Sequence, residues 1–213
     1  KEVIARIIHC GDGKGLSAPF VDINCAAITP SLFESELFGY EAGAFTGGLT
    51  RGQRGKLDLA SGGTLLLDEI AEIPLELQGK LLRVIQEKEF YRVGGLQKIK
   101  TNVRIICCTN VDLAQRVEQG TFRKDLYYRL KVGHLVVPPL QQRVEDILPL
   151  ANMFLWEFSR LKGKRFISIG KEAAKIMMEY EWPGNVRELQ NLMEWIVAMY
   201  DDEEVCPGHL NLD

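Results

Sequence analysis

The chain has 213 residues, of which 46% are hydrophobic and 26% are charged, which are ordinary proportions for a folded domain and exclude a disordered chain. Its 26 basic and 29 acidic residues give a formal net charge of −3, so no overall basic field marks it for nucleic acid or an anionic membrane. No apolar run approaches the ~18 residues of a membrane span. Residues 1–9 are amphipathic and do not form a secretory signal, which predicts a cytoplasmic protein.

The first quarter of the chain alternates between helical and strand patterns. Residues 1–10 place apolar side chains on one helical face, and residues 19–25 form a short run with strand character. A second helix is predicted over 29–39, with Pro30 at its first position. Residues 39–55 hold six glycines around one hydrophobic pair, which predicts a loop with an apolar tip.

Two later runs have the continuous apolar character of strands buried on both faces. They are TLLLDEI at 64–70 and NVRIICCTN at 102–110. Helical patterns are predicted over 74–89 and 111–131, and residues 134–139 are predicted to form a last strand stopped by two prolines. This alternation predicts an α/β fold with helices layered on a mostly parallel sheet.

The last third of the chain lacks strand patterns. Apolar positions recur at helical spacing in 143–161, 171–180 and 184–199, which predicts a small helical domain. We therefore expect two domains, an α/β core over 1–140 and a helical domain over 141–213.

Polar side chains stand at the carboxyl ends of both buried runs. Asp68 and Glu69 follow the first run, and Thr109 and Asn110 follow the second. Ligands of open α/β sheets bind beyond these ends. Two acids after an apolar strand are typical of the Walker B motif, in which the first helps to hold Mg²⁺ and the second polarises an attacking water. From the pattern alone, a structural role in capping the strand end is an equal alternative.

A Walker A glycine loop, which should precede the acidic pair, is not found in the sequence. GDGKG at 11–15 follows a helix and does not join a strand to a helix, so we do not interpret it as a phosphate cradle. Lys1 begins a helix upstream of the acidic pair, as a Walker A lysine would. Because the chain opens on this lysine and not on Met, we expect a piece of a longer protein, with the first strand and the glycine loop upstream.

Three arginines in two later helical segments have two interpretations each. Arg123 and Arg129 flank Asp125 and are either part of a solvated face with an Asp125–Arg129 pair, or fingers that reach the nucleotide of a neighbouring subunit. Arg187 lies at the start of a helix, where the helix dipole disfavours a positive charge unless an anion is near. This position is a hint of phosphate contact.

Seven segments together resemble the AAA+ domain of bacterial sigma-54-dependent transcriptional activators, the NtrC-like enhancer-binding proteins. They are ESELFGYEAGAFTGG (34–48), GGTLLLDEI (62–70), LLRVIQEKEFYRVGG (81–95), VRIICCTN (103–110), GTFRKDLYYRL (120–130), VPPL (137–140) and WPGNVRELQN (182–191). The resemblance runs nearly end to end. It implies an α/β fold of the AAA+ P-loop type, a three-layer sandwich with a mostly parallel sheet, followed by a small all-helical lid domain.

The resemblance also implies an ATP site with Mg²⁺. Lys1 matches the Walker A lysine, and Asp68 and Glu69 match the Walker B pair, with Asp68 as the metal ligand. Asn24 matches the asparagine that holds the catalytic glutamate. Thr109 with Asn110 matches sensor I. Arg123 and Arg129 match the trans-acting arginine fingers, and Arg187 matches sensor II.

A surface loop is implied as the contact to the partner. Its residues are Gly43, Ala44, Phe45, Thr46, Gly47 and Gly48. In the family this loop grips sigma-54, and a homo-oligomeric ring, a hexamer or heptamer, remodels the RNA polymerase holoenzyme at the closed promoter. Two positions depart from the family pattern: Gly48 replaces an alanine, and Gln141 replaces an arginine.

The resemblance further implies that DNA is bound only through a helix-turn-helix module beyond this chain, that no membrane is involved, and that the protein belongs to a two-component regulatory system. Two other functions remain open. The chain as given could be a non-hydrolysing module that binds sigma-54, or it could be an AAA+ remodelling ATPase of another kind.

Overall fold

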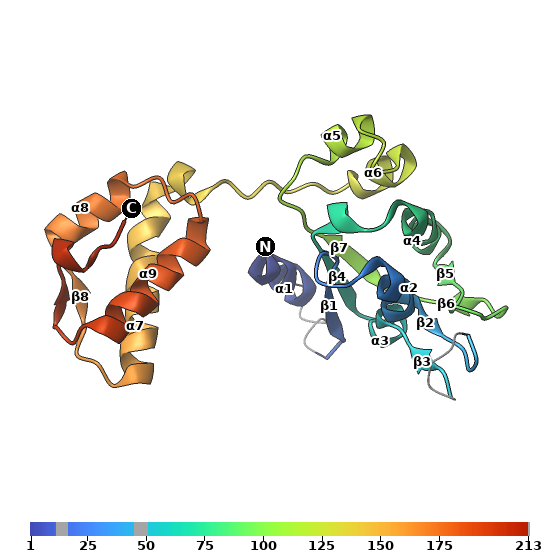
Figure 1. Cartoon of the computed structure of the whole chain (residues 1–213), viewed down its shortest axis with the longest axis horizontal. Helices are drawn as coiled ribbons and strands as arrows, with labels where there is room; N and C mark the ends of the chain where they lie inside the picture. The colour runs from blue at the N-terminus through green and yellow to red at the C-terminus, as the bar shows by residue number, and fades with distance from the viewer. Residues whose placement is uncertain (12–16, 45–50, 213) are drawn as a thin grey trace. The chain divides into compact units, whose positions relative to one another are not determined.

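The computed structural model describes residues 1–11, 17–44 and 51–212, shown in Figure 1. The chain divides into two compact units, Lys1–Leu135 and Val136–Asp213, which are described separately. The division falls shortly before the boundary proposed from the sequence.

A three-stranded parallel sheet forms the centre of the first unit. In spatial order its strands are β1 (Phe20–Asn24), β4 (Thr64–Asp68) and β7 (Arg104–Cys107). In the register, Asn24 lies opposite Asp68, and Leu67 lies opposite Cys107. Because the strands are parallel, all three carboxyl ends lie at one edge of the sheet.

The helices and short strand pairs of this unit surround that sheet. The helices are α1 (Glu2–Cys10), α2 (Pro30–Phe38), α3 (Lys56–Leu59), η2 (Ile70–Glu72), α4 (Leu75–Glu87), α5 (Leu113–Glu118) and α6 (Lys124–Leu130). The antiparallel pairs are β2 (Gly39–Tyr40) with β3 (Gln53–Arg54), and β5 (Glu89–Phe90) with β6 (Ile99–Lys100).

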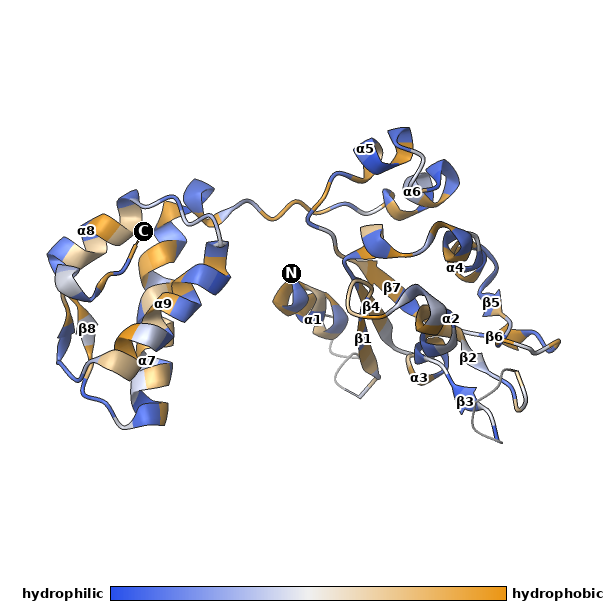
Figure 2. Cartoon of the chain, viewed as in Figure 1, coloured by the Kyte–Doolittle hydropathy of each residue, from blue (hydrophilic) through white to orange (hydrophobic). Residues whose placement is uncertain are grey.

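Strand β4 is buried on both faces, as its apolar run predicts. Leu65 and Leu67 belong to the main hydrophobic cluster, together with side chains of α2 and α4. Leu66 alternates to the opposite face of the strand, where α1 contacts β4. Figure 1 shows α1 on one side of the sheet and α2 and α4 on the other, and Figure 2 shows the hydrophobic colour of the strands between them. The unit therefore has the expected three layers.

The loop predicted over 39–55 starts and ends in a backbone pair. Strands β2 and β3 join at its base, and the backbone of Tyr40 also bridges to Val93. Gly39 ends helix α2 with a positive φ of 73°, and a Cβ at this position would lie 2.5 Å from the carbonyl oxygen of Gln53. Only glycine fits such a close backbone approach in this conformation.

We expect Gly39→Ala to destabilise the first unit by more than about 3 kcal/mol, because strained backbone and steric overlap act together. Gly43→Ala is the matched control, since Gly43 also has a positive φ of 76° but a Cβ there would meet no atom within 4 Å. It should cost only about 1 kcal/mol. Urea denaturation measures both losses, and equal losses would contradict the role of the close approach.

Two predicted elements differ in the structure. Residues 111–131 form two helices, α5 and α6, because Gly120 with a φ of 73° ends the first. Residues 134–139 form no strand, so that prediction was wrong. Pro138 and Pro139 lack the N–H that a ladder requires, and the side chains from 134 to 139 are exposed.

Three helices form most of the second unit, as predicted. They are α7 (Ile147–Lys162), α8 (Lys171–Glu179) and α9 (Asn185–Met199), with the short turns η3 (Leu140–Gln142), η4 (Val144–Asp146) and η5 (Pro207–His209). Phe154, Leu155 and Phe158 of α7 share a core with Met193 and Ile196 of α9.

The second unit is not entirely helical, which corrects the prediction that strands cease. β8 (Ser168–Ile169) and β9 (Glu204–Val205) form a short parallel pair. Strands of two residues are too short to show a period-2 pattern, so the sequence could not reveal them. In the described part of the chain, no helix is long and apolar enough to cross a membrane.

Candidate functional site

The carboxyl ends of the three parallel strands are joined by backbone hydrogen bonds. The N–H of Cys25 donates to the carbonyl oxygen of Asp68 (2.9 Å), and the N–H of Cys108 donates to that of Leu67 (2.9 Å). The N–H of Ile70 donates to the carbonyl oxygen of Cys108 (2.9 Å). These bonds fix the residues after β1, β4 and β7 at one edge of the sheet.

The acidic pair and Lys1 meet at this edge. The Asp68 carboxylate accepts a hydrogen bond from the N–H of Glu69 (3.1 Å), and Lys1 Nζ lies 3.6 Å from Glu69 Oε1. Glu69 has a positive φ of 52°, which is uncommon for a residue with a side chain. Strained backbone of this kind clusters at functional sites. An ion pair this open to water contributes little to stability, so Lys1 can exchange Glu69 for another anion at low cost.

Two neutral thiols, those of Cys25 and Cys108, lie near Asp68. Burial is the main cause that raises the pKa of Cys25 to about 12, and the negative charge of Asp68 adds to it. Burial and then Asp68 also raise the pKa of Cys108. Both thiols therefore stay protonated near neutral pH.

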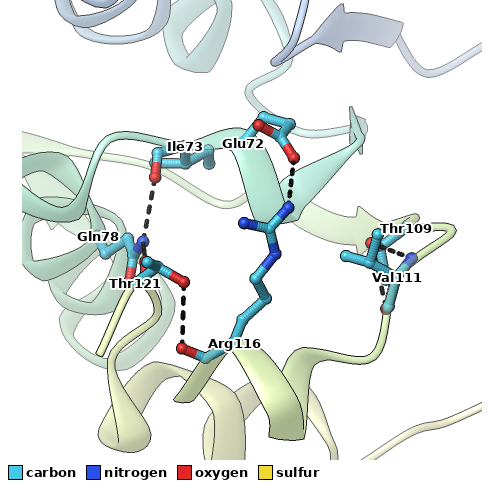
Figure 3. A network of polar contacts seen from close by, with 7 residues as sticks. All are labelled: Glu72, Ile73, Gln78, Thr109, Val111, Arg116 and Thr121. Atoms are coloured by element: carbon cyan, nitrogen blue, oxygen red, sulfur yellow. Dashed lines mark hydrogen bonds and ion pairs between the residues drawn. The ribbon is translucent and has the colours of Figure 1, made fainter. Parts of the chain in front are cut away.

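The other polar residues predicted at this edge lie where the strands end. The Asn24 side chain accepts a hydrogen bond from the N–H of Ala26 (2.9 Å), so it closes the turn after β1. In the described residues, the Glu69 carboxylate pairs with Lys1 and not with Asn24. The Thr109 hydroxyl accepts from the N–H of Val111 (3.2 Å), as Figure 3 shows, and Asn110 is exposed.

The Arg123 guanidinium is folded onto Asp125. Its Nη2 and Nε atoms donate to the two carboxylate oxygens of Asp125, at 2.7 and 3.0 Å. This hydrogen bonding lowers the pKa of Asp125 and raises that of Arg123. The alternative pairing of Asp125 with Arg129 is therefore not the one formed in the described residues, and Arg129 is an exposed residue of α6.

Arg187 belongs to the second unit. Helix α9 begins at Asn185, which places Arg187 in its first turn, as the sequence predicts. Its side chain is exposed. Glu188 caps the same turn by accepting from the N–H of Gly184 (2.7 Å).

The described part of the predicted partner loop is its first two residues, Gly43 and Ala44. The N–H of Ala44 donates to the carbonyl oxygen of Glu41 (3.1 Å). Phe45, Thr46, Gly47 and Gly48 lie outside the described residues.

Arg92 is a residue at the base of this loop that the sequence analysis missed. Its guanidinium donates to Glu41 (3.0 Å) and to Asp58 (3.1 Å), and the bond to Asp58 is the main cause that raises the pKa of Arg92. It thereby joins the segment that enters the loop, the helix that follows it, and the segment after β5. Its signal in the sequence was a lone cation within YRVGG, which is not distinctive.

Both units of the chain match known protein families. Residues 1–136 match the family described as the sigma-54 interaction domain, and residues 141–213 match the AAA+ ATPase lid domain. Regulatory protein AtoC of Escherichia coli (strain K12) is 53% identical over 199 residues, which cover 93% of this chain and 43% of AtoC. The DNA-binding transcriptional regulator NtrC of Proteus hauseri is 46% identical over 210 residues, covering 99% of this chain and 44% of NtrC.

Solved structures show the same fold. NtrX from Brucella abortus in complex with ADP has 38% sequence identity and a TM-score of 0.85, over 98% of this chain and 46% of the NtrX chain. NtrX in complex with ATP gives a TM-score of 0.84 at the same identity and coverage. The present chain thus spans less than half the length of these relatives. By sequence and by fold, the chain belongs to the sigma-54 interaction domain family of the AAA+ class, with an AAA+ lid domain following it.

Proposed function

We propose that this chain is the ATP-hydrolysing central domain of a sigma-54-dependent transcription activator. The observation that carries the proposal is the meeting of Lys1 with the Asp68–Glu69 pair at the carboxyl edge of the sheet, in a chain of this family. NtrX, a relative with the same fold, has been crystallised with ATP and with ADP.

The donor groups at the edge suit a magnesium nucleotide. Mg²⁺ binds nucleotides through one or two carboxylates, the substrate phosphates and several waters, and does not need a cage of protein ligands. Within the described residues, no group of three or more His, Cys, Asp or Glu side chains could hold a metal ion by itself. Asp68 would hold the ion, and the exchangeable Lys1 ammonium would bind phosphate oxygens. When bound, ATP with Mg²⁺ supplies a γ-phosphoryl group open to attack by water.

The remaining residues have roles at distinct atoms. Glu69 would accept a proton from the attacking water, and Asn110 with Thr109 would orient that water. Asn24 would restrain the Glu69 carboxylate by replacing Lys1 as its partner. Arg187 of the lid would contact a phosphate of the nucleotide.

Two further arginines would act on a neighbouring subunit. Arg123 and Arg129 would neutralise charge that develops on the phosphoryl group, in a homo-oligomeric ring of six or seven copies. Both are exposed, and the pair of Arg123 with Asp125 is open to solvent on both sides. Such a pair contributes little, so Arg123 can leave Asp125 cheaply.

The GAFTGG loop would bind sigma-54 and remodel its RNA polymerase holoenzyme at a closed promoter. An aromatic side chain at Phe45, flanked by glycines, can bury apolar area on a partner while the glycines absorb backbone changes. Arg92 would hold the base of the loop by its bonds to Glu41 and Asp58. DNA contact would come through a separate helix-turn-helix module, in a cytoplasmic regulator of the two-component type.

The binding step is tested with Lys1→Ala. We expect at least ~10-fold weaker binding of Mg²⁺-ATP, because charge-assisted hydrogen bonds to phosphate are lost. Isothermal titration measures the dissociation constant, and Lys98→Ala is the control, since Lys98 is exposed and pairs with Glu89 in the β5–β6 hairpin. Equal affinity of the two variants would contradict the phosphate role of Lys1. No measurable ATP binding by the wild-type protein would instead favour the non-hydrolysing interaction module.

A further inference from the structure

Gln78 is a buried polar residue of α4 to which the roles above assign nothing. It lies one residue after Leu77 on the packed face of the helix and is fully buried. A buried amide is costly unless its donors and acceptor are all used. The hydrogen-bond partners of the Gln78 side chain therefore indicate its role.

The Gln78 amide makes three hydrogen bonds, and the partners lie in two short segments. Its Nε2 donates to the carbonyl oxygens of Ile73 (3.0 Å) and Thr121 (3.1 Å), and its Oε1 accepts from the N–H of Arg123 (2.7 Å). Two carbonyl acceptors on one side and an N–H donor on the other fix the orientation of the amide. Figure 3 shows Gln78 with Ile73 and Thr121 around it.

The same two segments are joined a second time. Arg116 Nη2 lies 3.1 Å from Glu72 Oε1, and the carbonyl oxygen of Arg116 accepts from the Thr121 hydroxyl (3.2 Å), as Figure 3 shows. The same carbonyl oxygen also accepts from the N–H groups of Thr121 and Phe122. Residues 72–78, which follow the acidic pair, are thus attached to residues 116–123, which end at Arg123. The N–H of Arg123 is bound by Gln78 of α4, and its carbonyl oxygen accepts from the N–H of Tyr127 in α6 (3.0 Å).

The Arg123 guanidinium also lies close to α4. A Cβ added at Gly79 would lie 3.6 Å from Arg123 Nη1, which is an ordinary van der Waals distance. Gln78 binds the backbone N–H of Arg123, and its neighbour Gly79 lies beside the guanidinium.

We propose that Gln78 is a positioning residue for Arg123, so that its effect on hydrolysis falls on the neighbouring subunit and not on the subunit that contains it. This proposal rests on the proposed function, in which Arg123 acts in trans. Without the Gln78 amide, the N–H of Arg123 has no partner at the start of α6, and the backbone that carries the guanidinium is free to shift. A misplacement of about 1 Å at a catalytic group can cost ~10²-fold in rate.

The first test compares rates of the full-length assembled protein. Gln78→Met keeps the approximate shape of the side chain and removes all three hydrogen bonds. We expect kcat for ATP hydrolysis to fall ~10- to 100-fold. The KM for ATP should stay within about twofold, because the ATP site of the altered subunit itself is intact. Val84→Ala shortens a fully buried side chain of the same helix and controls for lost stability. A kcat of Gln78→Met equal to that of Val84→Ala would overturn the proposal.

The second test uses mixed assemblies and separates a trans effect from a cis effect. Gln78→Met subunits mixed with Glu69→Gln subunits should regain hydrolysis above the sum of the two alone, because the Glu69→Gln subunit supplies an intact finger. Mixing Gln78→Met with Arg123→Ala should regain nothing. The reverse pattern, or no recovery with either partner, would overturn the proposal.

A third mixture distinguishes this proposal from the function on which it rests. Arg123→Ala mixed with Glu69→Gln must itself regain hydrolysis if Arg123 acts in trans. If that mixture fails, the trans role of Arg123 is wrong and the proposal for Gln78 falls with it. If it succeeds while the Gln78→Met mixture fails, only the proposal for Gln78 is wrong.

Discussion

Glu69→Gln is expected to keep ATP binding within about threefold of wild type and to lower the rate of hydrolysis by ~10²- to 10⁴-fold. Glutamine has nearly the same shape but cannot accept the proton of the attacking water, and a positioned general base contributes a factor of this size. Binding survives because Lys1 and Asp68 are unchanged, and Lys1 loses only a partly exposed pair with Glu69. Titration with ATP and steady-state phosphate release measure the two effects.

The control for this variant is Glu76→Gln, another acid close in sequence. Glu76 lies exposed in the first turn of α4. The Glu76→Gln variant should hydrolyse ATP at the wild-type rate. If Glu69→Gln also does so, the assignment of Glu69 as the base is refuted.

The second large effect is expected for Arg123→Ala, with a kcat reduced ~10³-fold or more in the assembled protein, which is the contribution of an arginine finger. The fold should be unaffected, because Gln78 holds the backbone N–H of Arg123 and not its side chain. The guanidinium itself contacts Asp125 in the single chain, and that contact is exposed on both sides.

Steady-state hydrolysis measured as a function of protein concentration is the test. Lys124→Ala is the control, since it removes a neighbouring exposed cation of α6. The wild-type rate should rise with assembly and that of Arg123→Ala should not. A rate for Arg123→Ala equal to that of Lys124→Ala would show that Arg123 is a surface residue only.

The sheet could be predicted because its strands have extreme sequences. Leu65, Leu66 and Leu67 are apolar without alternation, and only a strand covered on both faces tolerates this. The pattern also places Asp68 at the carboxyl end of the strand, where the buried part of the sheet ends. Helix α4 was predictable by its spacing, and Leu81 and Val84 do pack into the main cluster.

The errors arise where pairing depends on distant neighbours. Residues 134–139 have the composition of a strand, but Pro138 and Pro139 cannot donate hydrogen bonds. The β8–β9 pair consists of two residues from each of two distant segments, so no local pattern reveals it. Backbone pairing of this kind depends on tertiary context, which local propensity does not contain.

The site residues also divide into those that the sequence predicts and those that it does not. Asp68, Glu69 and Lys1 are found by motif and chain order, and the structure brings them together. Arg92 and Gln78 are polar residues whose roles depend on partners far along the chain, 34 residues away for Arg92 with Asp58 and 45 for Gln78 with Arg123. A glutamine within a helix resembles a surface residue until its partners are known.

The most direct test of the account is formation of open promoter complexes by sigma-54 RNA polymerase in the presence of the full-length protein. With wild-type protein and ATP, open complexes should form at a rate that follows ATP hydrolysis. With Glu69→Gln, or with a non-hydrolysable ATP analogue, they should not form. Open complexes that form equally well without hydrolysis, or none with wild-type protein that hydrolyses ATP, would contradict the account.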